Sequence, residues 1–188
     1  MIIALSGEPG AGKSTVKNLL SNRLHLKSYS MGDLRGKMAL TQGITIDELN
    51  ARGMDDIASD REVDAFQTTL GETEDNFIID GWLSWHFIPN AFKVQLTVDP
   101  KIAAERIFAA RSLESDRNDE PQYASVAETQ SILAKRVEQN EARYQKWYGI
   151  SLKNDGKYDV VVDTTHLTPA EVADAILAAI PKNLDPQP

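Results

Sequence analysis

Apolar positions alternate between two spacings along the chain, and this alternation predicts that strands and helices follow one another. Short apolar runs, typical of buried parallel strands, occur at 2–6 and 77–81. Further strand candidates are 94–98 and 158–162, with a shorter and more polar one at 27–30. Between these runs apolar residues recur at helical spacing, as at Val16, Leu20 and Leu24. The pattern predicts a three-layer α/β/α fold around a parallel five-stranded sheet.

Polar residues mark the starts of several predicted helices. The Thr-x-x-Glu of 45–48 and the Ser-x-x-Glu of 125–128 have the form of a capping box, in which side chains satisfy backbone N–H groups. Thr168 precedes a proline at the first helical position and a glutamate at the third. Together with the apolar spacing, these signals predict helices over 13–24, 33–40, 61–70, 101–111, 125–148 and 169–180, and a short one from 45.

Two segments interrupt the strand–helix alternation. The stretch 33–73 is helical throughout, and 112–122 is a charged loop that ends in a proline. Because no repeat, low-complexity tract or linker separates them from the rest, we expect one domain over 1–188, with both segments inserted into it and a flexible tail at 181–188.

Composition excludes several classes of function. The 188 residues include no cysteine and three scattered histidines, which excludes disulfides and thiolate sites and argues against a dedicated zinc site. A net charge of −8 argues against broad nucleic-acid binding, which requires a basic face. The sequence has no signal peptide pattern and no apolar stretch near the roughly 20 residues that span a bilayer. We therefore expect a cytoplasmic protein without membrane or nucleic-acid partners.

The clearest motif lies between the first predicted strand and the first predicted helix. It fits the pattern G-x-x-x-x-G-K-[ST], a P-loop, in which glycines let backbone N–H groups turn inward around phosphates. The lysine is a point charge for the β- and γ-phosphates, and the serine hydroxyl is a ligand for Mg²⁺. The predicted ATP-binding residues are Gly7, Glu8, Pro9, Gly10, Ala11, Gly12, Lys13, Ser14 and Thr15.

Other charged residues fit phosphoryl transfer. The chain lacks the N-K-x-D and D-x-x-G motifs of a GTPase, but arginines occur in or beside both insertions, and arginine binds phosphate oxygens in bidentate fashion. Asp80 ends the strand at 77–80, where it would hold Mg²⁺ or a water on it; the alternative is a turn aspartate before Gly81. The arginines of interest are Arg35, Arg111, Arg117, Arg136 and Arg143, each of which alone could also be a solvated surface residue.

From 1 to about 180, the chain resembles the nucleoside monophosphate kinases, and among them the short archaeal-type cytidylate kinases. The P-loop and its strand, together with the stretch 158–164, fit this family. The more specific stretches are Ser30-Met31-Gly32-Asp33-Leu34-Arg35, Val63-Asp64 with Gln67 and Leu70, Ala104-Glu105-Arg106-Ile107, and Arg143-Tyr144 with Tyr148-Gly149-Ile150.

The resemblance implies roles for the two insertions. Segment 33–73 would bind a nucleoside monophosphate, with Arg35 on its phosphate and Asp33 recognising the nucleoside or positioning Arg35. Segment 112–122 would be a lid that excludes water when it closes. The resemblance further implies ATP and Mg²⁺ as cofactors and a monomeric enzyme of pyrimidine nucleotide metabolism. The implied catalytic residues are Lys13 and Asp80, together with Arg111, Arg117 and Arg136, which would close on the phosphates. Ser14 and Asp80 would bind the metal, and Asp64 and Arg143 would bind the substrate.

Departures from the family pattern leave the acceptor open. Trp82 stands where the family carries an arginine in E-G-R or D-G-R, and it would either pack in the core or stack on a base. Gln139 and Asn140 stand where the family tends to carry serine and glutamate. The leading hypothesis is an ATP-dependent CMP or dCMP kinase. The alternatives are UMP as the acceptor, another small-molecule kinase of the adenylate or dephospho-coenzyme A type, and a non-catalytic nucleotide-binding regulatory module.

Overall fold

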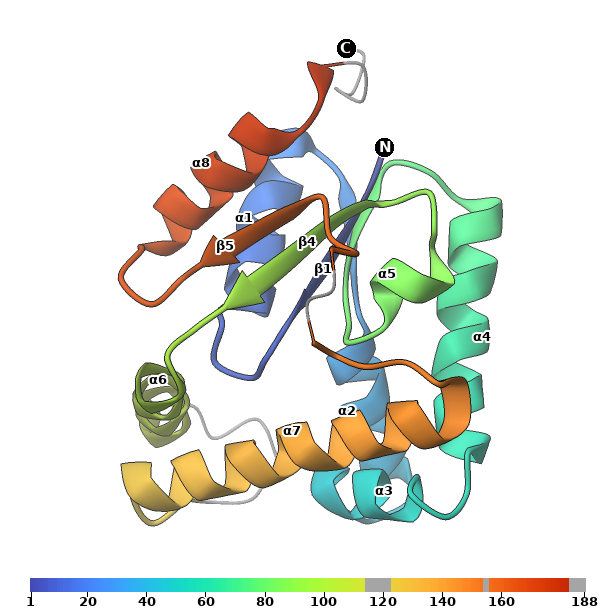
Figure 1. Ribbon diagram of the computed structural model, residues 1–188, viewed down its shortest axis with the longest axis vertical. Helices are drawn as coiled ribbons and strands as arrows, with labels where there is room; N and C mark the ends of the chain where they lie inside the picture. Colours follow the sequence, from blue (N-terminus) through green and yellow to red (C-terminus); the bar gives the residue numbers. More distant parts are fainter. Residues whose placement is uncertain (114–122, 154–155, 183–188) are drawn as a thin grey trace. The chain divides into compact units, whose positions relative to one another are not determined.

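The computed structural model describes residues 1–113, 123–153 and 156–182 (Figure 1). Its strands are β1 (Ile2–Gly7), β2 (Lys27–Ser30), β3 (Phe77–Asp80), β4 (Phe92–Thr97) and β5 (Val160–Asp163). Its helices are α1 (Lys13–Leu24), α2 (Met31–Thr41), α3 (Ile46–Arg52), α4 (Ala58–Thr73), α5 (Ser84–Phe87), α6 (Pro100–Leu113), α7 (Val126–Tyr148) and α8 (Pro169–Ala179). None of these helices is long and apolar enough to cross a membrane.

The five strands form one sheet in the order β2-β3-β1-β4-β5, and each neighbouring pair is parallel. This confirms the predicted parallel five-stranded sheet. In the register, Ile3 lies beside Ile78, and Leu5 lies beside Val94. Since side chains alternate between the two faces of a strand, these residues share one face. The carboxyl ends of all five strands meet at one edge, where β1 runs into the P-loop.

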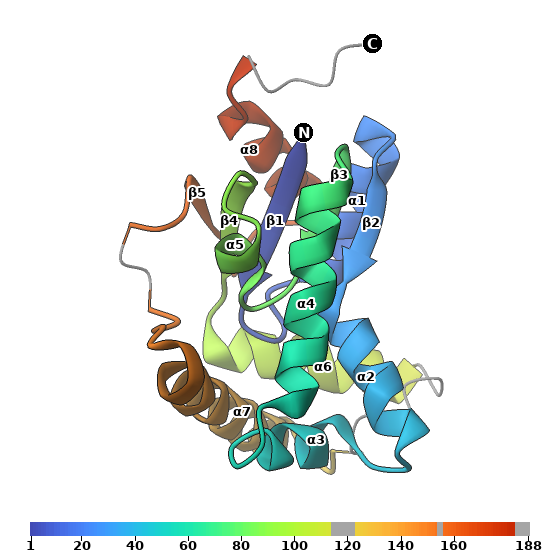
Figure 2. The ribbon, with the colours of Figure 1, turned by 90° about the vertical axis from the view of Figure 1, so that its right-hand side faces the viewer.

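The main core lies between one face of the sheet and the helices α1 and α8. Val16 and Leu20 of α1 and Val172 and Ile176 of α8 are at most 1% exposed and pack on the apolar residues of this face. The opposite face is covered by α5 and by the second half of α4, whose Phe66 contacts Tyr29 of β2 edge to face (Figure 2). Burial on both faces explains why the central strands β1 and β3 are buried along their whole length, whereas β4 alternates between buried and half-buried residues.

The chain divides into two compact units. The sheet unit comprises Met1–Met31, Asp64–Val98 and Asn154–Pro188, and the helical unit comprises Gly32–Val63 and Asp99–Lys153. The boundary therefore falls inside α4, and the end of the predicted insertion at 33–73 belongs with the sheet. Tight packing accounts for this, since a Cβ on Gly71 would approach the Ile88 side chain to 2.9 Å.

Most element boundaries match the sequence expectations within a few residues. The predicted helix 13–24 and strand 27–30 are confirmed as α1 and β2, and the capping boxes at Thr45 and Thr168 are present. At Ser125 the box is only half formed, because the Glu128 carboxylate accepts from the Ala124 N–H instead. The expected last strand was set too early, as β5 begins at Val160. Residues 114–122 of the predicted lid and 183–188 of the tail lie outside the described residues.

Candidate functional site

The P-loop of the sheet unit has the strand–loop–helix geometry that its sequence predicts. Gly7, Gly10 and Gly12 all have positive φ, of 146°, 81° and 83°. At Gly7 a Cβ would lie 2.3 Å from the carbonyl oxygen of Leu96, so only glycine fits there. Within the described residues no side chain caps the start of α1, so its first N–H groups remain suited to an anion.

Lys13 folds back over the loop that it follows. Its ammonium donates hydrogen bonds to the backbone oxygens of Gly7, at 2.8 Å, and Glu8, at 2.9 Å. The same nitrogen lies 5.8 Å from the centre of the Trp82 ring, within the range of a cation–π contact. The half-buried Trp82 thus lies beside the P-loop lysine.

Asp80 ends β3 and is held by a buried ion pair. Its Oδ1 lies 2.9 Å from the ammonium of Lys17 on α1, and the two side chains are 5% and 6% exposed. The hydroxyl of Ser30, which is Asp80's neighbour in the β2–β3 register, donates to Oδ2 at 3.3 Å. Lys17 was not predicted as a site residue, although it lies three residues before buried Leu20 on the inward face of α1.

A second polar chain fixes the turn after β3. Gln67 is 2% exposed; it donates to Asp64 Oδ1 at 3.0 Å and accepts from the hydroxyl of Ser84 at 2.9 Å. A Cβ on Gly81 would lie 2.5 Å from that hydroxyl, so the turn is close-packed. The half-buried Asp64, a predicted substrate-binding residue, is therefore oriented by a buried amide.

In the helical unit, two predicted phosphate-binding arginines share one carboxylate. Arg35 Nη1 lies 2.6 Å from Asp60 Oδ1, and Arg143 Nε lies 3.1 Å from Asp60 Oδ2. Both guanidinium groups also donate to Asn50 Oδ1, at 2.7 and 3.3 Å. The exposed fractions are 8% for Arg35, 1% for Arg143 and 4% for Asp60. The arginines were predicted from the sequence, but Asp60 and Asn50 were not, because they lie in polar helical stretches with no distinguishing pattern.

This network carries more positive than negative charge. Two guanidinium groups face one carboxylate, and Tyr144 supplies a neutral hydroxyl that accepts from Arg143 at 3.2 Å. Burial lowers the pKa of Arg35, and the neighbouring Arg143 lowers it further, whereas Asp60 raises it. Burial likewise raises the pKa of the Tyr144 phenol. Since arginine stays protonated, the surplus charge suits an anionic ligand.

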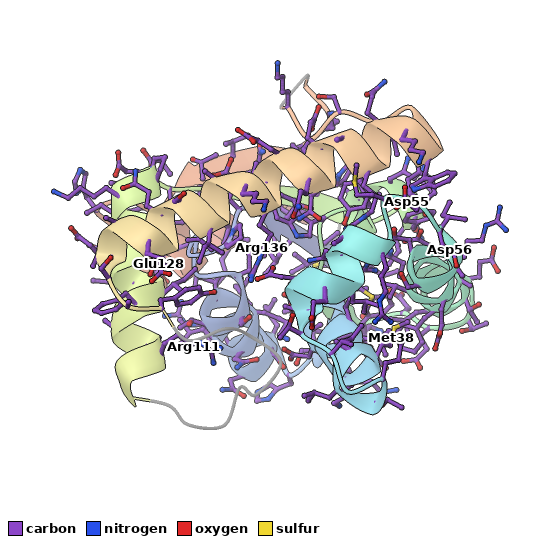
Figure 3. All side chains as sticks on the ribbon, turned by 90° about the horizontal axis from the view of Figure 1, so that it is seen from below. Met38, Asp55, Asp56, Arg111, Glu128 and Arg136 are labelled. Atoms are coloured by element: carbon purple, nitrogen blue, oxygen red, sulfur yellow. The ribbon has the colours of Figure 1, made fainter. Side chains whose placement is uncertain are left out.

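The remaining arginines lie on α6 and α7. Arg136 extends from α7 toward α3, where its guanidinium binds both carboxylate oxygens of Asp47, at 2.9 and 3.1 Å (Figure 3). Arg111 is half-buried near the end of α6. Asp33 is exposed in the first turn of α2. Arg117 lies outside the described residues.

The side chains near the P-loop can bind Mg²⁺ only together with phosphate oxygens of the nucleotide. Within the described residues no group of three His, Cys, Asp or Glu side chains could hold a metal. Ser14 is exposed at the start of α1, and the Asp80 carboxylate is already engaged by Lys17. Magnesium in phosphoryl-transfer sites is commonly held by few protein ligands and by the substrate phosphates, so the residues fit.

Comparison with known proteins identifies the family. A family model described as an AAA domain matches residues 3–128. A cytidylate kinase of Archaeoglobus fulgidus is 32% identical over 181 residues, covering 96% of this chain and 94% of that protein. The chain belongs to the archaeal-type cytidylate kinase family. Membership in this family makes it a P-loop kinase and confirms the resemblance drawn from the sequence.

One further relative and one solved structure are named for other activities. An S-adenosylmethionine-dependent nucleotide dehydratase of Lacinutrix mariniflava is 35% identical over 176 residues, covering 93% of this chain; the chain spans only 35% of that protein. The shikimate kinase of Acinetobacter baumannii, solved in complex with shikimate, aligns with a TM-score of 0.62 at 15% identity, covering 97% of this chain and 94% of that one. The second likeness shows the P-loop kinase fold alone.

Proposed function

We propose that this cytidylate kinase family member transfers the γ-phosphoryl group of ATP to a nucleoside monophosphate, with CMP or dCMP as the acceptor. The observation that carries the proposal is the buried pair of Arg35 and Arg143 on one carboxylate, in a chain that also has an intact P-loop. A second phosphate site distinguishes a kinase from a protein that only binds ATP. The two arginines supply the surplus charge that such a site requires.

On the donor side, the P-loop binds the triphosphate. The N–H groups at the start of α1 surround the β-phosphate, and Lys13 exchanges its bonds to the Gly7 and Glu8 carbonyls for the β- and γ-phosphates. Ser14 would ligate Mg²⁺, which neutralises charge on the phosphates when bound. Asp80, paired with Lys17, would orient a water on the metal.

On the acceptor side, Arg35 and Arg143 bind the monophosphate and hold an acceptor oxygen ready for in-line attack. Their shared Asp60 fixes both guanidinium planes before the ligand arrives, which lowers the cost of ordering them. Arg111, Arg117 and Arg136 offset negative charge on the phosphoryl group during its transfer. The predicted segments 33–73 and 112–122 act as the monophosphate-binding part and the lid, so that water is excluded during transfer.

Cytidine nucleotides are the proposed acceptors because the relatives that this chain covers almost completely are named for that activity. Relatives of this kind include the Archaeoglobus fulgidus enzyme, 94% of which is covered. The dehydratase is named for a nucleotide as well, which agrees with a nucleotide-binding segment. The shikimate kinase shares the fold at 15% identity, too low to suggest its substrate.

An acceptor panel tests this proposal. ADP release from ATP and Mg²⁺ is measured with CMP, dCMP, UMP, AMP, GMP, dephospho-coenzyme A, shikimate and water alone. We expect kcat/KM for CMP or dCMP to exceed every non-cytidine acceptor by at least about tenfold. A different preferred acceptor would retain the mechanism and change the substrate. ATP binding without turnover of any acceptor would refute the proposed kinase activity.

A further inference from the structure

One face of α7 is buried although it carries mainly polar and charged residues. Its buried positions are Thr129, Leu133, Arg136, Asn140, Arg143 and Tyr144. A helix that packs only to stabilise a fold buries an apolar stripe. A buried stripe of two arginines and an amide is instead typical of a surface that binds a polar ligand.

Asn140 differs from the other polar residues of this face because its acceptor is unsatisfied. It is 2% exposed, and within the described part of the chain no group donates a hydrogen bond to its Oδ1. Arg136 by contrast is paired with Asp47, and Arg143 with Asp60. Buried polar atoms without partners are rare in native proteins because each costs stability, so an orphaned acceptor requires a reason.

Its position in the helix suggests that reason. Asn140 follows Arg136 by four residues and precedes Arg143 by three, so all three side chains lie on one face within two turns. Together with Arg35, the two arginines bring three positive charges against the two carboxylates of Asp47 and Asp60. An anionic ligand drawn there would bring its own hydrogen-bond donors to the Asn140 carbonyl oxygen.

We infer that Asn140 is a specificity-determining residue, whose side-chain oxygen accepts a hydrogen bond from the acceptor nucleotide. This inference rests on the proposed function. The proposed donor is either the 4-amino group of the cytosine base or the 2′-hydroxyl of the ribose. UMP carries a carbonyl oxygen in place of the amino group, and dCMP lacks the 2′-hydroxyl. Comparing the three acceptors therefore distinguishes the sources.

The decisive variant is Asn140→Leu, which keeps the side-chain size and removes the acceptor. Gln145→Leu, the same type of change at an exposed position of α7, is the matched control. The thermal midpoint of the free protein, the Kd of CMP by calorimetry, and kcat/KM for CMP, dCMP and UMP are measured for each. A residue that only supports the fold would lower the midpoint and leave the ratios between acceptors unchanged.

We expect Asn140→Leu to leave the midpoint unchanged or raise it, because an unsatisfied polar atom is removed. The Kd of CMP should rise about tenfold or more, as for loss of one buried hydrogen bond to a ligand. If the donor is the amino group, the preference for CMP over UMP disappears; if it is the 2′-hydroxyl, the preference for CMP over dCMP disappears. Gln145→Leu should change neither.

Asn140→Asp provides the rescue, since a carboxylate keeps an acceptor oxygen at the same place and should retain the preference. A lower midpoint with unchanged Kd, or equal losses for all three acceptors, would overturn the inference. Weaker CMP binding by Asn140→Leu in a protein that turns over nothing would support the inference and refute the proposed kinase activity. A wild-type protein that does not bind CMP would overturn both.

Discussion

Replacing Asp60 with asparagine tests the buried charge network most severely. The Asp60 carboxylate is the anion that both Arg35 and Arg143 contact, at 2.6 and 3.1 Å, and all three residues are at most 8% exposed. The Asp60→Asn substitution would keep the shape of the side chain and remove its charge, which leaves two buried guanidinium groups without a carboxylate. Removing one partner of a buried ion pair typically costs about 3–5 kcal/mol.

That loss should be visible in unfolding experiments. For proteins of 150–250 residues, about 1 kcal/mol shifts the thermal midpoint by roughly 2–4 °C, so the expected fall is roughly 6–20 °C. Inorganic phosphate should raise the midpoint of Asp60→Asn more than that of the wild type, because the variant has a larger surplus of positive charge.

Asp174→Asn is the control, since Asp174 pairs with Arg23 at the surface and is 66% exposed. Its loss should cost at most about 1 kcal/mol. If Asp60→Asn were no more destabilised than this control and responded no more to phosphate than the wild type, the charge argument for the acceptor site would be wrong.

Three further predictions concern the sheet unit and its helices. Gly43→Ala, at positive φ with nothing within 4 Å, should lower the free energy of unfolding by about 1–2 kcal/mol. Gly7→Ala adds a clash with the Leu96 carbonyl oxygen, so it should lower that free energy by more than about 2 kcal/mol and weaken ATP binding; similar losses by urea denaturation would contradict the crowding argument. Lys17→Met should lower the free energy of unfolding by about 3 kcal/mol, because it leaves Asp80 unpaired. Adding Asp80→Asn should recover part of that loss; a double variant whose loss equals the sum of the two single losses would contradict the pairing. Thr168→Ala should cost about 1 kcal/mol at pH 7 through loss of the cap. The Thr168 backbone N–H and hydroxyl both lower the pKa of Glu171 in the folded state, and the variant loses only the hydroxyl. The hydroxyl's share of the stability is therefore present above the usual glutamate pKa and is lost as the pH falls; urea titrations in which the wild-type advantage grew below about pH 4 would contradict it.

Local signals made the P-loop, the proposed donor half of the site, predictable from the sequence. The P-loop is contiguous, and the apolar run before it and the helical spacing after it determine its context. The strands β1 and β3 were recognisable because burial on both faces leaves them almost wholly apolar. The short helix α5 was missed, since four residues are too few to display a helical period.

The buried polar contacts, including those of the proposed acceptor half, were only partly predictable because the partners are distant in sequence. Arg143 and Asn50 lie 93 residues apart, and nothing local identifies Asn50 as a partner of that arginine. Lys17 and Asp80 likewise meet only because α1 packs on the face of the sheet to which Asp80 points. A charged residue on an amphipathic pattern is usually solvated, so the burial of Arg35 and Arg143 becomes evident only when the helices are packed.

The central claim is that the chain transfers phosphate to a cytidine monophosphate rather than only binding or hydrolysing ATP. The most direct measurement follows ATP, Mg²⁺ and CMP by ³¹P NMR with the wild type and with Lys13→Ala. The account predicts CDP and ADP in equal amounts with little inorganic phosphate, and a loss of at least about a hundredfold in rate with Lys13→Ala. Inorganic phosphate without CDP, or CDP formed at an unchanged rate by Lys13→Ala, would contradict it.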